Sequence, residues 1–172
     1  YVFNGKKGNY AEDDKTNPIN VYGISKNAGE KAVRKALPSA CIIRTARLFG
    51  DGRENTVKHF AWLAKKKKEI SAIKDERGNF TFTTDLAKGL CDLFLQKNIF
   101  PEGTFHLINE GSMTPLELAE FIVTHKESLT CVTPVSAESL ERIAKRPQDT
   151  SLKNTKLPLL PPLADALSRF LS

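Results

Sequence analysis

One tyrosine and one lysine near the start of the chain have the spacing that proton chemistry needs. Tyr22 and Lys26 are four residues apart, so a helix beginning near Val21 places both side chains on one face, about one turn apart. A free tyrosine has a pKa of about 10, and a nearby ammonium favours the phenolate and lowers that pKa. Such a tyrosine can exchange a proton near neutral pH. The spacing alone is a weak indication of catalysis, because it often arises by chance.

The flanking residues predict the element that positions this pair. Asn20 can cap a helix over about 21–36, because its side chain accepts a hydrogen bond from a free N–H of the first turn. Within that helix an apolar stripe recurs at helical spacing, at Val21, Ile24, Ala28, Ala32 and Val33. The apolar run over 40–45 then predicts a strand buried on both faces. A helix leading into such a strand is half of a β-α-β unit.

The rest of the chain alternates between helical and extended patterns, which predicts an α/β fold. Asn55 can cap a second helix and Thr83 or Thr84 a third, while Thr114 and Glu117 form a capping box. Further helices are expected from Ser136 to about Ala144 and over 163–171, and strands over 69–73, 80–83, 104–108 and 132–135.

The composition indicates a soluble globular protein of one domain. Of the 172 residues 40% are apolar and 27% are charged, and no apolar run reaches the roughly 20 residues that cross a membrane. The net charge of +6 includes four lysines over 65–68, which we interpret as the end of a helix. No aromatic residues interleave with that run, so we expect no nucleic acid partner, and no membrane partner either.

The cysteines and histidines show no pattern of a metal or disulfide site. The three cysteines are far apart and form no Cys-x-x-Cys pair, which predicts reduced thiols in a cytoplasmic protein. The three histidines are equally scattered and lack metal-ligand spacing.

Longer segments around the tyrosine and lysine match a known pattern. They are Tyr1-Val2-Phe3-Asn4-Gly5, Asn17-Pro18-x-Asn20-Val21-Tyr22-Gly23-x-Ser25-Lys26-x-Ala28-Gly29-Glu30, Ile43-Arg44-Thr45, Thr83-x-Asp85-Leu86-Ala87 and Arg146-Pro147-x-x-Thr150-Ser151-Leu152. In these segments the chain resembles the extended short-chain dehydrogenase/reductases, and among them the dTDP-4-dehydrorhamnose reductase family. The resemblance implies that Tyr22 and Lys26 are catalytic.

The resemblance also implies a fold and a missing part. It implies the C-terminal part of a Rossmann-type parallel sheet with helices, plus a small α/β substrate-binding lobe. Residues 1–172 would form one incomplete NAD(P)-dependent reductase domain, with the rest of the Rossmann core over 1–60 and the remaining core elements and substrate lobe over 61–172. The chain has no Gly-rich turn of the kind that holds a dinucleotide pyrophosphate. We therefore expect the N-terminal nucleotide-binding half to be absent, and the fragment alone to be inactive and to bind NADPH weakly or not at all.

The activity implied by the resemblance is a reduction with NADPH or NADH. The 4-keto group of dTDP-4-dehydro-6-deoxy-L-mannose would be reduced to give dTDP-L-rhamnose, a rhamnose precursor for polysaccharide synthesis. Tyr22 would donate the proton, and Lys26 would bind the nicotinamide ribose and lower the pKa of Tyr22. Tyr22, Lys26, Thr45 and Ala46 would bind the cofactor.

The same resemblance assigns Tyr1, Arg47, Arg146 and Ser151 to the substrate. Arg146 would lie near the diphosphate. Family members commonly have Trp where this chain has Arg47, so an aromatic platform is replaced by a cation. Arg47 is then either a partner for a phosphate or an ordinary surface or ion-paired arginine.

Two other functions stay open at this point. One is a nucleotide-sugar epimerase or dehydratase of the same superfamily, which shares the Tyr-x-x-x-Lys pattern. The other is a non-catalytic regulatory subunit that resembles the regulatory subunit of methionine adenosyltransferase. Some family members use Mg²⁺, which this sequence does not support, and the resemblance allows for a homodimer.

Overall fold

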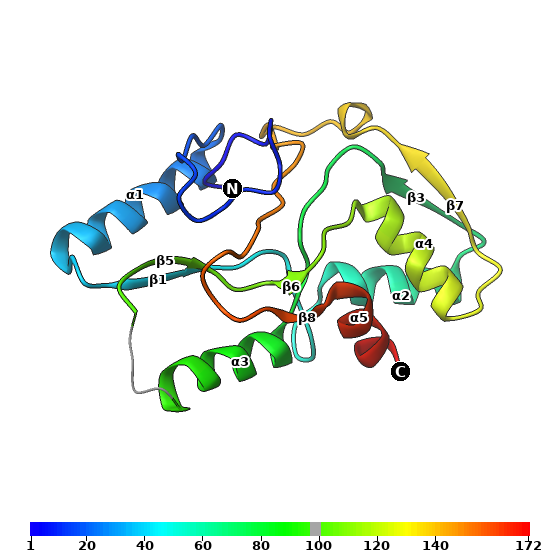
Figure 1. Cartoon of the computed structure of the whole chain (residues 1–172). Helices are drawn as coiled ribbons and strands as arrows, with labels where there is room; N and C mark the ends of the chain where they lie inside the picture. Colours follow the sequence, from blue (N-terminus) through cyan, green and yellow to red (C-terminus); the bar gives the residue numbers. More distant parts are fainter. Residues whose placement is uncertain (97–100) are drawn as a thin grey trace.

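The strands of the protein pair in parallel across long stretches of sequence (Figure 1). The computed structural model describes residues 1–96 and 101–172. Within them the pairs are β1 (Cys41–Arg44) with β5 (Gly103–His106), β2 (Leu48–Phe49) with β4 (Thr81–Phe82), β3 (Glu69–Ile73) with β7 (Cys131–Val135), and β6 (Asn109–Glu110) with β8 (Leu160–Pro162). Parallel pairing requires a crossover between the partners, and helices supply it here. The predicted α/β class is confirmed.

The helices begin close to where the capping residues predict. They are α1 (Val21–Ala36), α2 (Thr56–Lys66), α3 (Thr83–Cys91), α4 (Pro115–His125) and α5 (Leu163–Leu171). Asn20 accepts a hydrogen bond from the Gly23 N–H at 2.8 Å, and Asn55 accepts one from Lys58 at 3.1 Å. Thr114 and Glu117 form the predicted capping box. These three predicted helix starts are confirmed.

Two predicted helix features are wrong. The cap residue of α3 is Phe82, without a side-chain hydrogen bond, because β4 runs directly into α3 and Thr83 is already helical. The segment after Ser136 forms only a short 3₁₀ turn, η2 (Ala137–Ser139), instead of a helix to Ala144. Asp75 accepts hydrogen bonds from the Ser136 hydroxyl and the Ala137 N–H at 2.6 and 2.8 Å, which anchors this segment to the loop after β3.

The largest hydrophobic core lies between α2, α4 and α5, on the side of Figure 1 where the C-terminus ends. It contains large side chains from several helices and strands, among them Phe49, Phe60, Phe82, Leu118, Ile122 and Leu167. The last turn of α2 carries Lys65 and Lys66, in agreement with a lysine run that closes a helix. A π-helical turn, η1 (Asp92–Gln96), continues α3.

The first residues of the chain are fixed against a segment near its end. Tyr10 pairs with Leu152, and the Tyr10 N–H donates to the Ser151 carbonyl oxygen at 2.9 Å. The Phe3 ring stacks on the Tyr10 ring with centroids 4.2 Å apart. In Figure 1 the N-terminal loop therefore lies beside the late connecting segment that leads towards β8.

The apolar stripe of α1 points away from the part of the chain that the structure describes. Val21 and Ile24 are 82% and 54% exposed, and Gly23 is the buried residue of the helix. A Cβ atom at position 23 would lie 2.2 Å from the Tyr1 carbonyl oxygen, so only glycine allows this contact. The helix thus packs through Gly23 and its polar face, while α3 lies on the other side of the β1 and β5 pair (Figure 1).

The strand over 41–44 is less buried than its apolar sequence predicts. All four of its residues are partly exposed. Within residues 1–96 and 101–172, β1 pairs along one edge with β5 and has no strand along the other. The expectation of a fully buried strand is therefore wrong for the described chain, in which one edge of β1 is open.

Candidate active site

Tyr22 and Lys26 lie on one face of α1, as their spacing predicts. The Lys26 ammonium nitrogen is 5.5 Å from the centroid of the Tyr22 ring. Tyr22 is 57% exposed, so its hydroxyl is accessible to a ligand. The first turn is held in place by the Asn20 cap, whose amide also donates to the Lys145 carbonyl oxygen at 3.0 Å. This geometry is compatible with the catalytic roles that the resemblance implies.

A second tyrosine packs against the first. The Tyr1 and Tyr22 rings meet edge to face, with centroids 5.8 Å apart and an interplanar angle of 86°. Tyr1 is brought there by the close contact between its carbonyl oxygen and Gly23. Tyr1 and Tyr22 are separated in the sequence, but their side chains form one wall of the same site.

A cavity of about 610 Å³ opens beside these rings. Six residues that the sequence predicts for the site line it: Tyr1, Tyr22, Lys26, Thr45, Ala46 and Arg47. Residues 45–47 follow the carboxyl end of β1, the place where parallel α/β sheets bind their ligands. The structure therefore brings together residues from the chain start, from α1 and from the end of β1.

Glu30 and Arg44 also line this cavity, beyond the predicted site residues. The guanidinium of Arg44 binds the Glu30 carboxylate at 2.8 and 2.6 Å, and the two side chains are only 11% and 19% exposed. The Arg44 guanidinium also lies 5.2 Å from the centroid of the Phe3 ring. A signal existed in the sequence, because Glu30 follows Lys26 by one helical turn and Arg44 ends an apolar strand.

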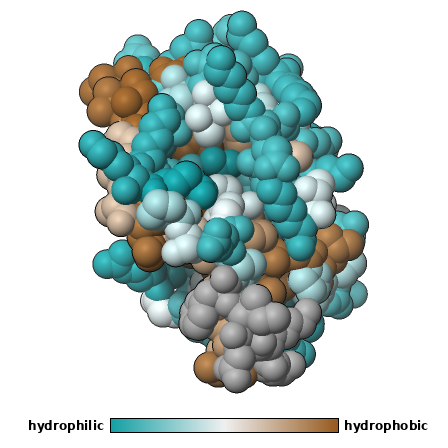
Figure 2. All heavy atoms as spheres, turned by 60° about the vertical axis from the view of Figure 1, so that its left-hand side comes forward, coloured by the Kyte–Doolittle hydropathy of each residue, from teal (hydrophilic) through white to brown (hydrophobic). Residues whose placement is uncertain are grey.

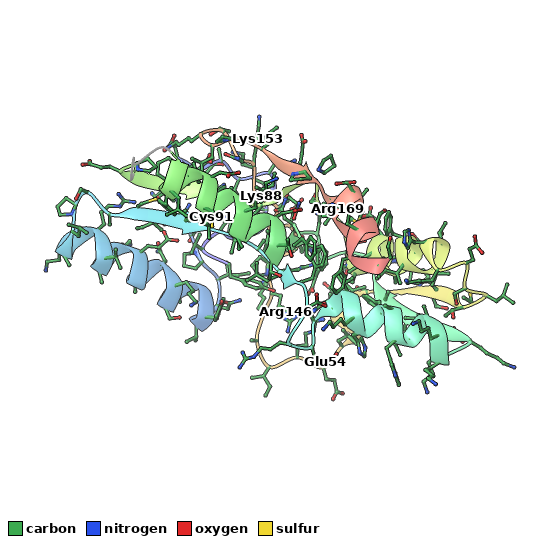
Figure 3. All side chains as sticks on the ribbon, turned by 90° about the horizontal axis from the view of Figure 1, so that it is seen from below. Glu54, Lys88, Cys91, Arg146, Lys153 and Arg169 are labelled. Carbon is green, nitrogen blue, oxygen red and sulfur yellow. The ribbon has the colours of Figure 1, made fainter. Side chains whose placement is uncertain are left out.

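Arg146 lies outside this cavity. It is exposed and lines a second cavity of about 570 Å³ together with Glu76 and Arg142, whose side chains pair at 2.5 Å. In Figure 3 Arg146 lies on the loop that passes between α1 and α2 in that view, away from the α3 helix that carries Lys88 and Cys91. The structure thus places Arg146 in a neighbouring cavity and not beside Tyr22.

Ser151 is buried and its hydroxyl is already engaged. The hydroxyl accepts a hydrogen bond from the Asn9 N–H at 2.7 Å and donates one to Asp149 at 2.6 Å. These contacts fix the N-terminal loop to the late segment. The preceding residue, Thr150, lines the cavity instead. We therefore leave Ser151 out of the proposed substrate contacts.

Other kinds of site find no support in the described chain. Residues 1–96 and 101–172 hold no group of three or more His, Cys, Asp or Glu side chains placed to bind a metal ion. The helices found there are also too short or too polar to span a membrane. Figure 2 shows a largely hydrophilic face with hydrophobic side chains in separate patches.

The family described as the RmlD substrate binding domain matches residues 1–163. The chain belongs to this family. The spore coat polysaccharide biosynthesis protein SpsK of Bacillus subtilis (strain 168) is 35% identical over 148 residues, which cover 86% of this chain and 51% of that protein. A dTDP-4-dehydrorhamnose reductase of Streptomyces griseus is 35% identical over 161 residues, which cover 91% of this chain and 53% of that protein.

A solved structure shares the fold. The crystal structure of dTDP-4-dehydrorhamnose reductase from Bacillus anthracis str. Ames in complex with NADP matches with a TM-score of 0.88 and 32% identity, over 99% of this chain and 61% of that chain. The resemblance to this reductase family is thereby confirmed. The chain spans about half the length of the curated relatives it matches.

Proposed function

We propose that this chain supplies the catalytic and substrate-binding part of a dTDP-4-dehydrorhamnose reductase. The reaction would reduce the 4-keto group of dTDP-4-dehydro-6-deoxy-L-mannose to dTDP-L-rhamnose with NADPH or NADH. The observation that carries the proposal is the Tyr22 and Lys26 pair, 5.5 Å apart from ammonium to ring centroid, at a cavity of about 610 Å³. The relative from Streptomyces griseus that bears this name supports the choice of reaction.

Tyr22 acts as the proton donor in this proposal. As the keto carbon is reduced, its oxygen gains negative charge, and the Tyr22 hydroxyl gives it a proton. The positive charge of Lys26 stabilises the tyrosinate that remains. The Tyr1 and Tyr22 rings pack at nearly a right angle, and this contact limits the orientations that the phenol can adopt.

The residues at the cavity fit the nicotinamide end of a dinucleotide. Within the described chain Lys26 forms no salt bridge, so its three N–H donors are available for the hydroxyl groups of a ribose. Thr45 and Ala46 supply further lining at the end of β1. The cofactor would supply a hydride. The Bacillus anthracis reductase, which matches this fold, was solved in complex with NADP.

We also propose that the reductase is a cytoplasmic homodimer. Free cysteines at positions 41, 91 and 131 suit a reducing compartment. The exposed apolar residues of α1, Val21 and Ile24, offer a surface that a second subunit could cover. Sedimentation equilibrium of the purified protein tests the dimer, and a single monomeric species would contradict it.

Product analysis tests the proposed reaction. The assay uses the full-length polypeptide in which these 172 residues occur, with dTDP-4-keto-6-deoxy sugars and NADPH. A reductase consumes one NADPH for each sugar reduced. Interconversion of sugars without net consumption of cofactor would instead identify an epimerase. A stoichiometric protein partner without any turnover would identify a regulatory subunit.

A further inference from the structure

Arg47 is a partly buried cation in the wall of the candidate active site. Within the described residues no carboxylate lies at salt-bridge distance from its guanidinium. The centroid of the Phe80 ring lies 5.2 Å from its guanidinium carbon. Burial lowers the pKa of Arg47, and the nearby charge of Arg146 lowers it further, whereas the neighbouring Tyr1 favours the charged form of Arg47, which raises its pKa. A desolvated cation of this kind is stabilised when an anion binds to it.

The surrounding chain fixes the guanidinium in one place. The Arg47 carbonyl oxygen accepts a hydrogen bond from the Thr81 N–H at 3.1 Å, directly before the β2 and β4 pairing. Phe80, under the guanidinium, is 1% exposed. A Cβ atom at Gly78 would lie 3.4 Å from the guanidinium carbon, so the side chain rests against bare backbone. The donor groups are therefore oriented before any ligand arrives.

Glu76 does not neutralise this charge. It raises the pKa of Arg47 from a distance, but its own carboxylate pairs with Arg142 at 2.5 Å and is 6% exposed. It also lines the second cavity, whereas Arg47 lines the one that contains Tyr22. The charge of Arg47 is consequently available to a ligand of the candidate active site.

Tyr1 is a neighbour of both Arg47 and Tyr22, the proposed proton donor. The Tyr1 ring packs on the Tyr22 ring with centroids 5.8 Å apart, and Tyr1 also lies close enough to Arg47 to favour its positive charge. A ligand whose carbonyl group reaches Tyr22 can thus place a second group at Arg47, past the Tyr1 ring. An anionic second group would be favoured there over a neutral hydroxyl, because charge-assisted hydrogen bonds are the stronger ones.

We propose that Arg47 is a specificity residue that selects keto-sugar substrates carrying an anionic group on the Arg47 side of Tyr1. The group is a phosphate of the nucleotide moiety or a carboxylate on the sugar, since either offers oxygen acceptors that match a guanidinium. This inference rests on the proposed reductase function, and it names the residue of that same site that recognises the anionic part of the substrate.

A binding experiment without turnover tests this inference. The 172-residue chain is titrated with inorganic pyrophosphate, glucuronate or glucose, and NMR follows the Arg47 Nε–H and the Leu48 backbone N–H. We expect saturable shifts with at least one of the two anions and none with glucose. Arg47→Gln should weaken anion binding about tenfold, the loss of one charged hydrogen bond. Arg53→Gln removes the same charge from an exposed position and should leave binding unchanged.

The two anions separate the two sources of the charge. Saturation by pyrophosphate alone assigns Arg47 to a phosphate, and saturation by glucuronate alone assigns it to a sugar carboxylate. Arg47→Met, which keeps an apolar stem over Phe80, replaces the glutamine variant if that variant does not fold. The inference is overturned if neither anion saturates the shifts, if glucose binds equally well, or if both Arg47 variants bind like the unchanged chain. Anion binding in a polypeptide that reduces no sugar would overturn the proposed function alone.

Discussion

Arg44, at the end of β1, holds the Glu30 carboxylate of α1 through two hydrogen bonds of 2.8 and 2.6 Å. This pair joins the helix that carries Tyr22 and Lys26 to the strand whose end supplies Thr45, Ala46 and Arg47. The orientation of the candidate catalytic pair therefore depends on an ion pair in the wall of the same cavity. The burial of the pair is important for stability. If one partner is removed, the other charge stays mostly desolvated without compensation, which destabilises the folded protein.

Glu30→Gln should destabilise the protein by about 3 kcal/mol, because it leaves the largely buried Arg44 charge without a counter-charge. The free energy of unfolding in urea measures this change. Glu120→Gln removes an equal charge from an exposed position on α4 and should have little effect. Equal stability of the two variants would show that the ion pair does not hold α1 in place.

Gly23→Ala should loosen the contact between α1 and the start of the chain. Its new methyl group would lie 2.2 Å from the Tyr1 carbonyl oxygen, so the helix or Tyr1 has to move. Gly29→Ala is the matched control, because a Cβ atom there meets nothing within 4 Å. In the same helix the control should raise stability by about 0.5–1 kcal/mol. Thermal unfolding of both variants measures the difference, and a stabilised Gly23→Ala protein would refute the close contact.

His106 should make the protein less stable as the pH falls below about 6.5, the pKa of an ordinary histidine. Burial is the main cause that lowers the pKa of His106 in the folded protein. Its Nδ1 lies 2.9 Å from the Lys153 carbonyl oxygen and donates to it, and its Nε2 is buried without a partner among the described residues. Below that pH the unfolded chain binds a proton that the folded chain refuses, so the free energy of unfolding decreases.

Variants at two histidines check this pH dependence. His106→Gln should flatten the loss of stability between about pH 7 and 5, where an untitrated buried histidine contributes up to roughly 1.4 kcal/mol per pH unit. His59 is exposed, and His59→Gln should keep the slope of the unchanged protein. The same slope in both variants would mean that His106 titrates freely in the folded state. Urea unfolding at a series of pH values supplies the data.

The local features of the fold are predictable from the sequence, whereas the long-range contacts are not. The caps at Asn20 and Asn55, and the position of Tyr22 and Lys26 on one face, depend only on neighbours within a few residues. The burial of Ser151 depends on Asn9, a partner 142 positions away. Such a contact leaves no periodic signal in the sequence.

The orientation of α1 shows the same limit. A stripe that includes Val21 and Ile24 would ordinarily pack inwards. Instead the contact of Gly23 with Tyr1 and the pair of Glu30 with Arg44 turn the polar face inwards. Both contacts are tertiary, so helical periodicity could predict the helix but not the side on which it packs.

The role of Tyr22 as proton donor is tested by the rate of sugar reduction by Tyr22→Phe in the full-length polypeptide that contains this chain. Phenylalanine keeps the ring that packs on Tyr1 and removes only the hydroxyl that donates the proton. If Tyr22 is the proton donor, kcat falls by at least about 100-fold, the usual contribution of a general acid, while the affinity for NADPH stays nearly unchanged. A rate like that of the unchanged enzyme would remove Tyr22 from the mechanism and contradict the proposed function.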